Sequence, residues 1–270
     1  MFVIASNITT RDPEVKRAFD LGKAAGWNVT GQPAELLGSL AKRCEIAGAD
    51  AIEIDIQQHY DEPDAIKFAI RIIQDSTGAQ LCLSSNNPSA LEAGLSMCKR
   101  PALVNYLSVD ETRLKQVLPA AAKNGASIVL LVSDPTAPTD ALDMLKKTAI
   151  LIGAANGEGI TNDRIFVDPG IIHVTDDLGQ RHMAEVIEFL RDLPQAVEPS
   201  VGTTCWLQNA STGAPAHLRP VIDGSVLHTL AGAGLSSVFI DVLRKENMRA
   251  MRLVKILQND LVYSDADIGL

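Results

Sequence analysis

The sequence predicts an α/β fold, a single (β/α)8 TIM barrel formed by one domain that spans residues 1–270. Short aliphatic runs alternate with helical patterns along the whole chain, giving eight strand–helix units of about 30 residues each, as this barrel requires. No linker or low-complexity segment interrupts the series. The alternative, a doubly wound open sheet, usually carries a glycine-rich phosphate turn after its first strand. Residues 6–10 (SNITT) contain no glycine, so the barrel is favoured.

Each expected strand is a short run dominated by aliphatic residues, which is typical of strands buried in a parallel sheet. The expected strands cover residues 2–7, 51–56, 80–84, 102–106, 127–132, 165–167, 203–207 and 238–242. The expected helices cover residues 34–47, 63–75, 88–98, 111–123, 140–155, 182–192, 224–233 and 248–258. A stretch that contains Gly, Pro and Asn, residues 26–33, is expected to precede the first helix.

Composition and charge exclude nucleic acid as a partner. The chain is 46% hydrophobic but only 4% aromatic, which suits elements that pack through aliphatic side chains. The net charge is −9, and no run of Lys or Arg exceeds two residues. Binding nucleic acid requires a clustered basic surface, which this sequence does not provide.

The cysteines and the first residues indicate the cellular compartment of the protein. The cysteines (Cys44, Cys82, Cys98 and Cys205) lack CxxC spacing, as is typical of reduced and mostly buried thiols. Residues 1–8 do not form a signal peptide, and no apolar run approaches the roughly 18 residues that a membrane span needs. We therefore expect a soluble cytoplasmic protein without membrane contact.

A carboxylate directly follows the strand expected at residues 165–167, where the sequence reads IFVDPG. Asp168 needs a partner or a cleft, because burying an unpaired charge at the end of a strand is costly. Asp can instead cap the turn that follows a strand, so these residues alone leave both interpretations open. In a barrel, the active-site cleft lies at the carboxyl ends of the strands.

Every expected strand ends in, or is directly followed by, a small polar or acidic residue. These residues are Asn7, Asp55, Ser84, Asn105, Ser133, Asp168, Asn209 and Asp241. Asn and Asp favour strand-to-loop turns, which explains any one of these residues better than all of them together. A mouth of amides, hydroxyls and acids without lysine suits a flat heterocycle, because a carboxylate accepts two parallel N–H bonds and an amide both donates and accepts.

Motifs spread over almost the whole chain carry a resemblance to a known family. They are residues 48–55 (GADAIEID), 81–95 (LCLSSNNPSALEAGL), 167–169 (VDP), 207–211 (LQNAS), 219–223 (RPVID) and 261–265 (LVYSD), together with Asn105. In this order and spacing they resemble the pterin-binding barrels, and within them the methyltetrahydrofolate:corrinoid methyltransferases. The resemblance implies that Asp168 and Asn105 contact the pterin and that Asn209 is the catalytic amide. Further candidates for the pterin site are Ser84, Asp55, Asn7, Arg219 and Asn86.

Two departures from the family pattern concern the site. The third strand of the family normally ends in Leu-Asp-Ser, which places a second carboxylate on the pterin, whereas this chain has Ser84 at the position of that Asp. Glu53, Asp55 or Asn86 are possible substitutes, and the sequence does not decide among them. The loop between Asn209 and Arg219 is also about two residues longer than in the family, by the same resemblance.

The activity implied by the resemblance is methyl transfer between N5 of tetrahydrofolate and the cobalt of a corrinoid (cobalamin) carried by a partner protein. N5 is a poor leaving group, so catalysis requires a hydrogen-bond donor whose bond strengthens as charge develops, and Asn209 is the expected donor. Cob(I)alamin is itself the nucleophile, which agrees with a mouth that lacks activated Ser, Cys or Lys. The expected substrates are tetrahydrofolate or 5-methyltetrahydrofolate and the corrinoid, the expected partner is the corrinoid protein, and a homodimer is implied by resemblance alone.

Two other functions stay open. Dihydropteroate synthases resemble the chain at residues 168–170, but they use a lysine-containing segment on strand seven and an Arg-x-His after strand eight. Residues 207–209 (LQN) and 240–243 (IDVL) match neither segment. A non-catalytic barrel subunit of a corrinoid protein complex, with a lost pterin site, is suggested by Ser84, although Asn105, Asp168 and Asn209 together argue against it.

No protein-bound metal is expected. Zinc activation of a thiol requires clustered Cys and His ligands, and the five histidines share no such spacing with the cysteines. His173 follows Asp168 closely enough to be a candidate for the border of the site. Trp206 is expected to pack in the seventh strand rather than to contact the corrinoid.

Overall fold

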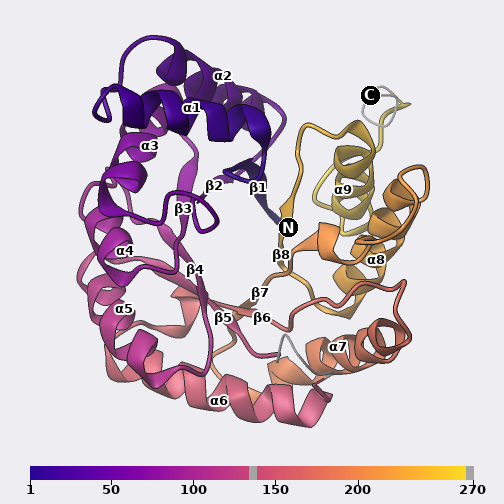
Figure 1. The fold of residues 1–270 in the computed structure, drawn as a ribbon. Coiled ribbons are helices and arrows are strands. Elements are labelled where there is room, and N and C mark those ends of the chain that lie inside the picture. Colours follow the sequence, from indigo (N-terminus) through magenta and orange to yellow (C-terminus); the bar gives the residue numbers. More distant parts are fainter. Residues whose placement is uncertain (134–138, 266–270) are drawn as a thin grey trace.

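A computed structural model describes residues 1–133 and 139–265, and in it parallel strands form a nearly closed barrel (Figure 1). The strands are β1 (Phe2–Thr9), β2 (Ala51–Asp55), β3 (Gln80–Ser84), β4 (Leu103–Leu107), β5 (Ser127–Leu131), β6 (Ile165–Asp168), β7 (Gly202–Thr203) and β8 (Ser237–Ile240). Their order in the sheet is β7-β6-β5-β4-β3-β2-β1-β8, so each strand lies beside its sequence neighbour and β1 also pairs with β8. The predicted (β/α)8 TIM barrel is confirmed.

The helices cover the outside of the barrel, as Figure 1 shows for α3 to α7, which follow one another down its left side and along its lower rim. They are α1 (Pro13–Ala24), α2 (Gln32–Ile46), α3 (Pro63–Ser76), α4 (Pro88–Leu95), α5 (Glu111–Lys123), α6 (Ala141–Gly157), α7 (Asp177–Ala196), α8 (Arg219–Ala233) and α9 (Lys245–Leu257). Short 3-10 turns occur at Asn162–Arg164 and Leu207–Asn209. Across the described ranges, no helix combines the length and apolar character needed to span a bilayer.

Helix α1 was not predicted from the sequence, although its signals are present. Asp12 caps it by accepting hydrogen bonds from two backbone N–H groups of the first turn, and Pro13 occupies that turn. Its buried residues Val15, Ala18, Phe19 and Gly22 recur at the spacing of one helical face. This face packs on an aromatic cluster, in which the rings of Phe19 and Tyr60 stack with centroids 5.4 Å apart.

The last strands differ most from the predicted boundaries. β7 ends at Thr203, whereas the sequence predicted a strand to residue 207, and Asn209 therefore lies in a 3-10 turn rather than just after a strand. Helices α7 and α8 each begin five residues earlier than predicted, at Asp177 and Arg219. β1 continues two residues beyond its predicted end, to Thr9.

Only a few bonds close the barrel between β7 and β8. The backbone N–H of Phe239 donates to the carbonyl of Cys205 at 2.8 Å, and Trp206 forms an isolated parallel bridge with Phe239. Nearer the start of the strands, the Thr203 backbone N–H and hydroxyl bond with the hydroxyl of Ser236. This seam holds the barrel together without a continuous ladder of strand pairing.

The interior of the barrel changes from apolar to polar along the strands. An apolar cluster, separate from the main core between sheet and helices, consists of Ile4, Ala51, Cys82, Leu103, Val129 and Phe239. Side chains two residues apart on a strand point to the same face. The next inward layer therefore carries Glu53 on β2, Ser84 on β3, Asn105 on β4 and Asp168 on β6. The aliphatic strand pattern positions these polar side chains at the carboxyl ends, where barrel active sites lie.

Candidate functional site

A cavity of about 490 Å³ opens at the carboxyl ends of the strands. Its lining includes the predicted residues Asp55, Asn105, Asp168 and Asn209, which come from β2, β4, β6 and the turn after β7. Other side chains that line it are Arg11, Glu53, Gln57, Tyr106, Leu131, Ser133, Ile171, Ile172, His173, Asp176, Leu178 and Trp206. The size falls within the usual range of small-molecule sites, and the lining combines polar groups with an aliphatic wall.

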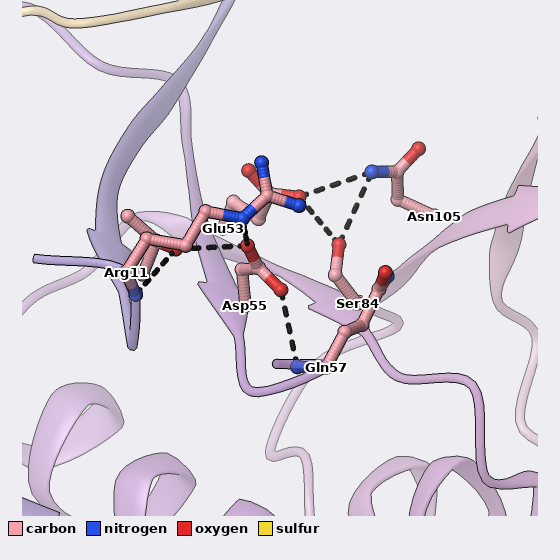
Figure 2. A network of polar contacts seen from close by, with 7 residues as sticks. Arg11, Glu53, Asp55, Gln57, Ser84 and Asn105 are labelled. Carbon is pink, nitrogen blue, oxygen red and sulfur yellow. Dashed lines mark hydrogen bonds and ion pairs between the residues drawn. The ribbon is translucent and has the colours of Figure 1, made fainter. Parts of the chain in front are cut away.

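A hydrogen-bonded network forms the polar side of the cavity (Figure 2). The Ser84 hydroxyl donates to Oε1 of Glu53, and the Asn105 amide donates to the same oxygen at 3.0 Å and to the Ser84 hydroxyl at 3.1 Å. The strands that carry them are adjacent, with Ser84 aligned to Asn105. Oε2 of Glu53 and Oδ1 of Asn105 are buried and have no hydrogen-bond partner. The network therefore leaves two buried side-chain oxygens without a partner, both in residues that line the cavity.

Burial dominates the ionisation of Glu53. Burial, with a smaller contribution from the nearby charge of Asp55, raises the pKa of Glu53 to about 8, against the bonds from Ser84 and Asn105 and the charge of Arg11. In the free protein at neutral pH, Glu53 is therefore mostly protonated. From the sequence, Glu53 was predicted only as one possible substitute for the missing carboxylate. A charged residue inside an otherwise aliphatic strand already indicates a buried polar site, because an unpaired buried charge is costly.

Replacing Glu53 with Gln is expected to change how stability depends on pH. A carboxyl whose pKa is higher in the folded than in the unfolded state stabilises the fold fully below its unfolded pKa, and that contribution is lost as pH rises through the folded pKa. With a folded pKa of about 8, wild-type protein loses stability between pH 6 and 9 that a neutral Gln retains. Between pH 6 and pH 9, the free energy of unfolding of wild type should therefore fall by about 2 to 3 kcal/mol relative to that of the variant.

Denaturant unfolding of both proteins at pH 6 and pH 9 measures this difference, since other titrating groups act equally in the two. A constant difference between variant and wild type across the interval would show that Glu53 does not carry a raised pKa.

Asp168 both caps a turn and lines the cavity, so the two interpretations left open by the sequence coexist. Its Oδ1 accepts the backbone N–H of Gly170 at 2.7 Å, and its side chain is 6% exposed. Gly170 has a φ of +69°, and a Cβ there would collide with the side chain of Ser133. The turn therefore requires glycine. Burial raises the pKa of Asp168 to about 7, against the effect of the Gly170 bond.

Asp55 lines the cavity, and each of its carboxylate oxygens already accepts a hydrogen bond. Oδ2 accepts the hydroxyl of Thr9 at 2.8 Å, and Oδ1 accepts the backbone N–H of Gln57 at 3.2 Å. The Nε of Arg11 lies 3.9 Å from Oδ2. Figure 2 shows the Arg11 side chain reaching over Glu53 and Asp55 from the end of β1. Arg11 was not predicted as a site residue, because the strand was expected to end at residue 7, whereas β1 extends to Thr9 and brings Arg11 to the cavity.

Asn209 and Trp206 reach the cavity from the segment after β7. Asn209 is exposed in the 3-10 turn Leu207–Asn209, where its side chain is available to a ligand. Trp206 stacks on Phe239 with ring centroids 5.4 Å apart and an interplanar angle of 13°, which agrees with the predicted packing role, but it also lines the cavity. His173 lines the cavity as well, 3.9 Å from Asp176.

The structure places four of the predicted site residues outside the lining of the cavity. Ser84 lies behind Glu53 and contacts the site through it. The Asn7 amide donates to Asp241 and so ties β1 to β8. Arg219 donates to the carbonyl of Ala214 at 2.9 Å, and the backbone of Asn86 bonds with Asp61 and Arg113. Whether these four act on a ligand stays a prediction.

The cysteines contribute no activated nucleophile. Burial raises the pKa of Cys44 to about 12 and that of Cys98 to about 11, and it raises the pKa of Cys82 and Cys205 well above the ordinary value. A thiol in such an environment is inert, because the thiolate is the reactive form. Within residues 1–133 and 139–265, no group of three or more His, Cys, Asp or Glu side chains is arranged to hold a metal ion.

Comparison with known proteins bears on this site. No protein-family model matches the chain. A methylcorrinoid:tetrahydrofolate methyltransferase of Eubacterium limosum is 24% identical over 194 residues, which cover 70% of this chain and 69% of that protein. Sequence and fold both resemble the pterin-binding barrels.

The fold similarity comes from solved dihydropteroate synthases. The enzyme of Xanthomonas albilineans, solved in complex with 7,8-dihydropteroate, matches with a TM-score of 0.67 and 18% identity over 95% of this chain and 93% of that chain. The Yersinia pestis enzyme, solved with a pterine-sulfa conjugate, matches with a TM-score of 0.67 and 16% identity over 96% and 94% of the two chains. At these identities the likeness establishes the fold.

Proposed function

We propose that this protein transfers a methyl group between N5 of tetrahydrofolate and the cobalt of a corrinoid carried by a partner protein. The observation that carries the proposal is the combination of Asp168, Asn105 and Asn209 around one cavity. The sequence similarity to a methylcorrinoid:tetrahydrofolate methyltransferase supports the reaction class. The dihydropteroate synthase-like fold supports a pterin as the bound heterocycle.

The pterin ring offers an edge that matches the acceptors of this cavity. Its 2-amino group and the neighbouring ring N–H point in parallel, as in an amidine, and a carboxylate accepts such a pair through its two oxygens. Asp168 is the proposed partner of this edge, and its carboxylate becomes the charged acceptor when the ligand arrives. Asn105 accepts a further N–H through Oδ1, which is unpartnered in the free protein.

Asn209 is the proposed donor at N5. When Co(I) attacks the methyl carbon, the pair of electrons of the C–N5 bond moves to N5, which takes up a proton from solvent. In the reverse direction, N5 of tetrahydrofolate gives up that proton to solvent, its electron pair attacks the cobalt-bound methyl group, and cobalt keeps the bonding electrons as Co(I). Both directions pass through the same transition state, in which a preorganised amide N–H stabilises the electron density at N5, and this is an electrostatic contribution to catalysis.

Anaerobic optical spectroscopy tests this function. Purified protein is mixed with reduced cob(I)alamin and 5-methyltetrahydrofolate, and the conversion of the Co(I) spectrum to that of methylcobalamin is followed; the reverse uses methylcobalamin and tetrahydrofolate. Turnover in either direction is the expected result. A protein that binds tetrahydrofolate and stays inactive with free cobalamin and with its own corrinoid protein would contradict the proposal. Condensation of a dihydropterin pyrophosphate with p-aminobenzoate would instead identify a dihydropteroate synthase.

A further inference from the structure

Two side-chain oxygens of residues that line the cavity, Oε2 of Glu53 and Oδ1 of Asn105, lack hydrogen-bond partners although they are buried. Glu53 is 1% exposed and Asn105 is 2% exposed, and both line the cavity. A buried polar atom without a hydrogen bond costs the free energy of its lost hydration, so native structures rarely leave one unpaired. In Figure 2 the Asn105 carbonyl points away from the network that its amide makes. We therefore expect Oε2 of Glu53 and Oδ1 of Asn105 to gain hydrogen-bond partners when a ligand binds.

Among the groups that could replace the missing carboxylate at Ser84, the geometry favours Glu53. Both oxygens of Asp55 already accept hydrogen bonds from Thr9 and Gln57. Asn86 lies outside the cavity lining. Glu53 reaches the cavity with Oε2 free, and its Oε1 is fixed by the Ser84 hydroxyl and the Asn105 amide.

We propose that Glu53 is the second carboxylate of the ligand site, with Oε2 of Glu53 and Oδ1 of Asn105 accepting N–H donors of the bound pterin. The inference rests on the proposed function and names a binding residue for that same site. Ser84 is the positioning residue, because its hydroxyl holds the Glu53 carboxylate in place. This chain would then supply the second carboxylate from β2, whereas the family pattern supplies it from the adjacent β3.

Ser84 and Glu53 are linked by charge as well as by position. An Asp at position 84 would place a second buried carboxylate against Glu53, and two like charges in contact disfavour ionisation of both. Serine donates a hydrogen bond instead, which favours the ionised form of Glu53. N–H donors of a ligand act in the same direction, so binding at pH 7 should release a proton from Glu53.

Calorimetric titration with tetrahydrofolate tests the proposal. Four proteins are compared: wild type, Glu53→Gln, the double variant Glu53→Gln/Ser84→Asp, and Glu92→Gln, which makes the same change on the exposed surface of α4. Titrations at pH 7 in two buffers of different ionisation enthalpy count the protons released. Glu53→Gln retains the acceptor for Ser84 and Asn105 and removes the unpartnered carboxylate oxygen.

Glu53→Gln should weaken binding by roughly 10- to 100-fold, as expected for the loss of a charge-assisted hydrogen bond, and should release fewer protons. The double variant, which restores a carboxylate from β3, should regain most of the affinity, and Glu92→Gln should bind like wild type. Wild-type affinity and proton release in Glu53→Gln, or no recovery in the double variant, would overturn the proposal.

The same titration separates this inference from the proposed function. Wild type that binds tetrahydrofolate but transfers no methyl group with any corrinoid contradicts the function and leaves the role of Glu53 to be decided by the variants. Wild type that does not bind tetrahydrofolate contradicts both.

Discussion

Replacing Asn209 with Ala should lower the rate of methyl transfer by about 10²- to 10³-fold, the usual effect of removing one donor to a developing charge. The affinity for tetrahydrofolate should change little, because Asp168 and Asn105, and not Asn209, hold the ring in the proposed binding mode. Asn209 lies exposed in a 3-10 turn, so its removal leaves no cavity in the core. The loss should therefore appear in kcat and not in the dissociation constant.

Single-turnover kinetics with methylcobalamin and tetrahydrofolate measure the rate of the chemical step, and fluorescence titration measures affinity. Thr212→Ala is a matched control, since Thr212 is an exposed side chain of the same segment. Equal losses of rate and affinity in Asn209→Ala would assign Asn209 to binding rather than to N5.

Replacing Asp168 with Asn should weaken tetrahydrofolate binding by on the order of 100-fold at pH 8, the size expected when a charged acceptor of two N–H bonds becomes a neutral amide. Asn retains an oxygen for the bond from Gly170, so the turn after β6 is preserved. Loss of affinity then reports on the ligand and not on the fold.

The dependence of binding on pH gives a second measure of the same residue. Asp168 has a pKa of about 7 in the free protein, and a ligand that donates N–H bonds to it favours the charged form. The affinity of wild type should therefore rise as pH increases through 7, and the Asn variant should lack this component. Dissociation constants measured from pH 5.5 to 8.5 test this. An identical pH profile in both proteins would exclude Asp168 from the binding site.

The sequence predicts the barrel well because the relevant signals are local. Each aliphatic run needs two buried faces, and a strand between the barrel interior and the helices provides them. The missed helix α1 had equally local signals in Asp12, Pro13 and the buried spacing from Val15 to Gly22. The end of β7 at Thr203 could not be predicted in this way, because it depends on how the barrel closes against β8.

The sequence predicts which residues lie at the strand ends that form the site, but it does not predict their hydrogen-bond partners. Asp55, Asn105, Asp168 and Asn209 do meet at one cavity, as expected for residues at the carboxyl ends of parallel strands. Which carboxylate oxygen at the cavity lacks a hydrogen-bond partner depends on residues that are close in space but distant in sequence. Asp55 is satisfied by Thr9, on a strand that proved longer than predicted, whereas Glu53, one layer deeper, keeps an unused oxygen.

The short β7 has a consequence for how this protein can vary. Sheet register is fixed by strand pairing, and a residue inserted into a paired strand shifts every later side chain to the opposite face. The last strand pairing of this segment is the bridge between Trp206 and Phe239, so residues 210–218 connect the 3-10 turn to α8 without setting the register of a strand. Insertions near Gly213 can therefore lengthen this segment while the barrel stays aligned. Asn209 thus lies directly before the segment whose length can change, while Asp168 and Asn105 stay fixed to the sheet.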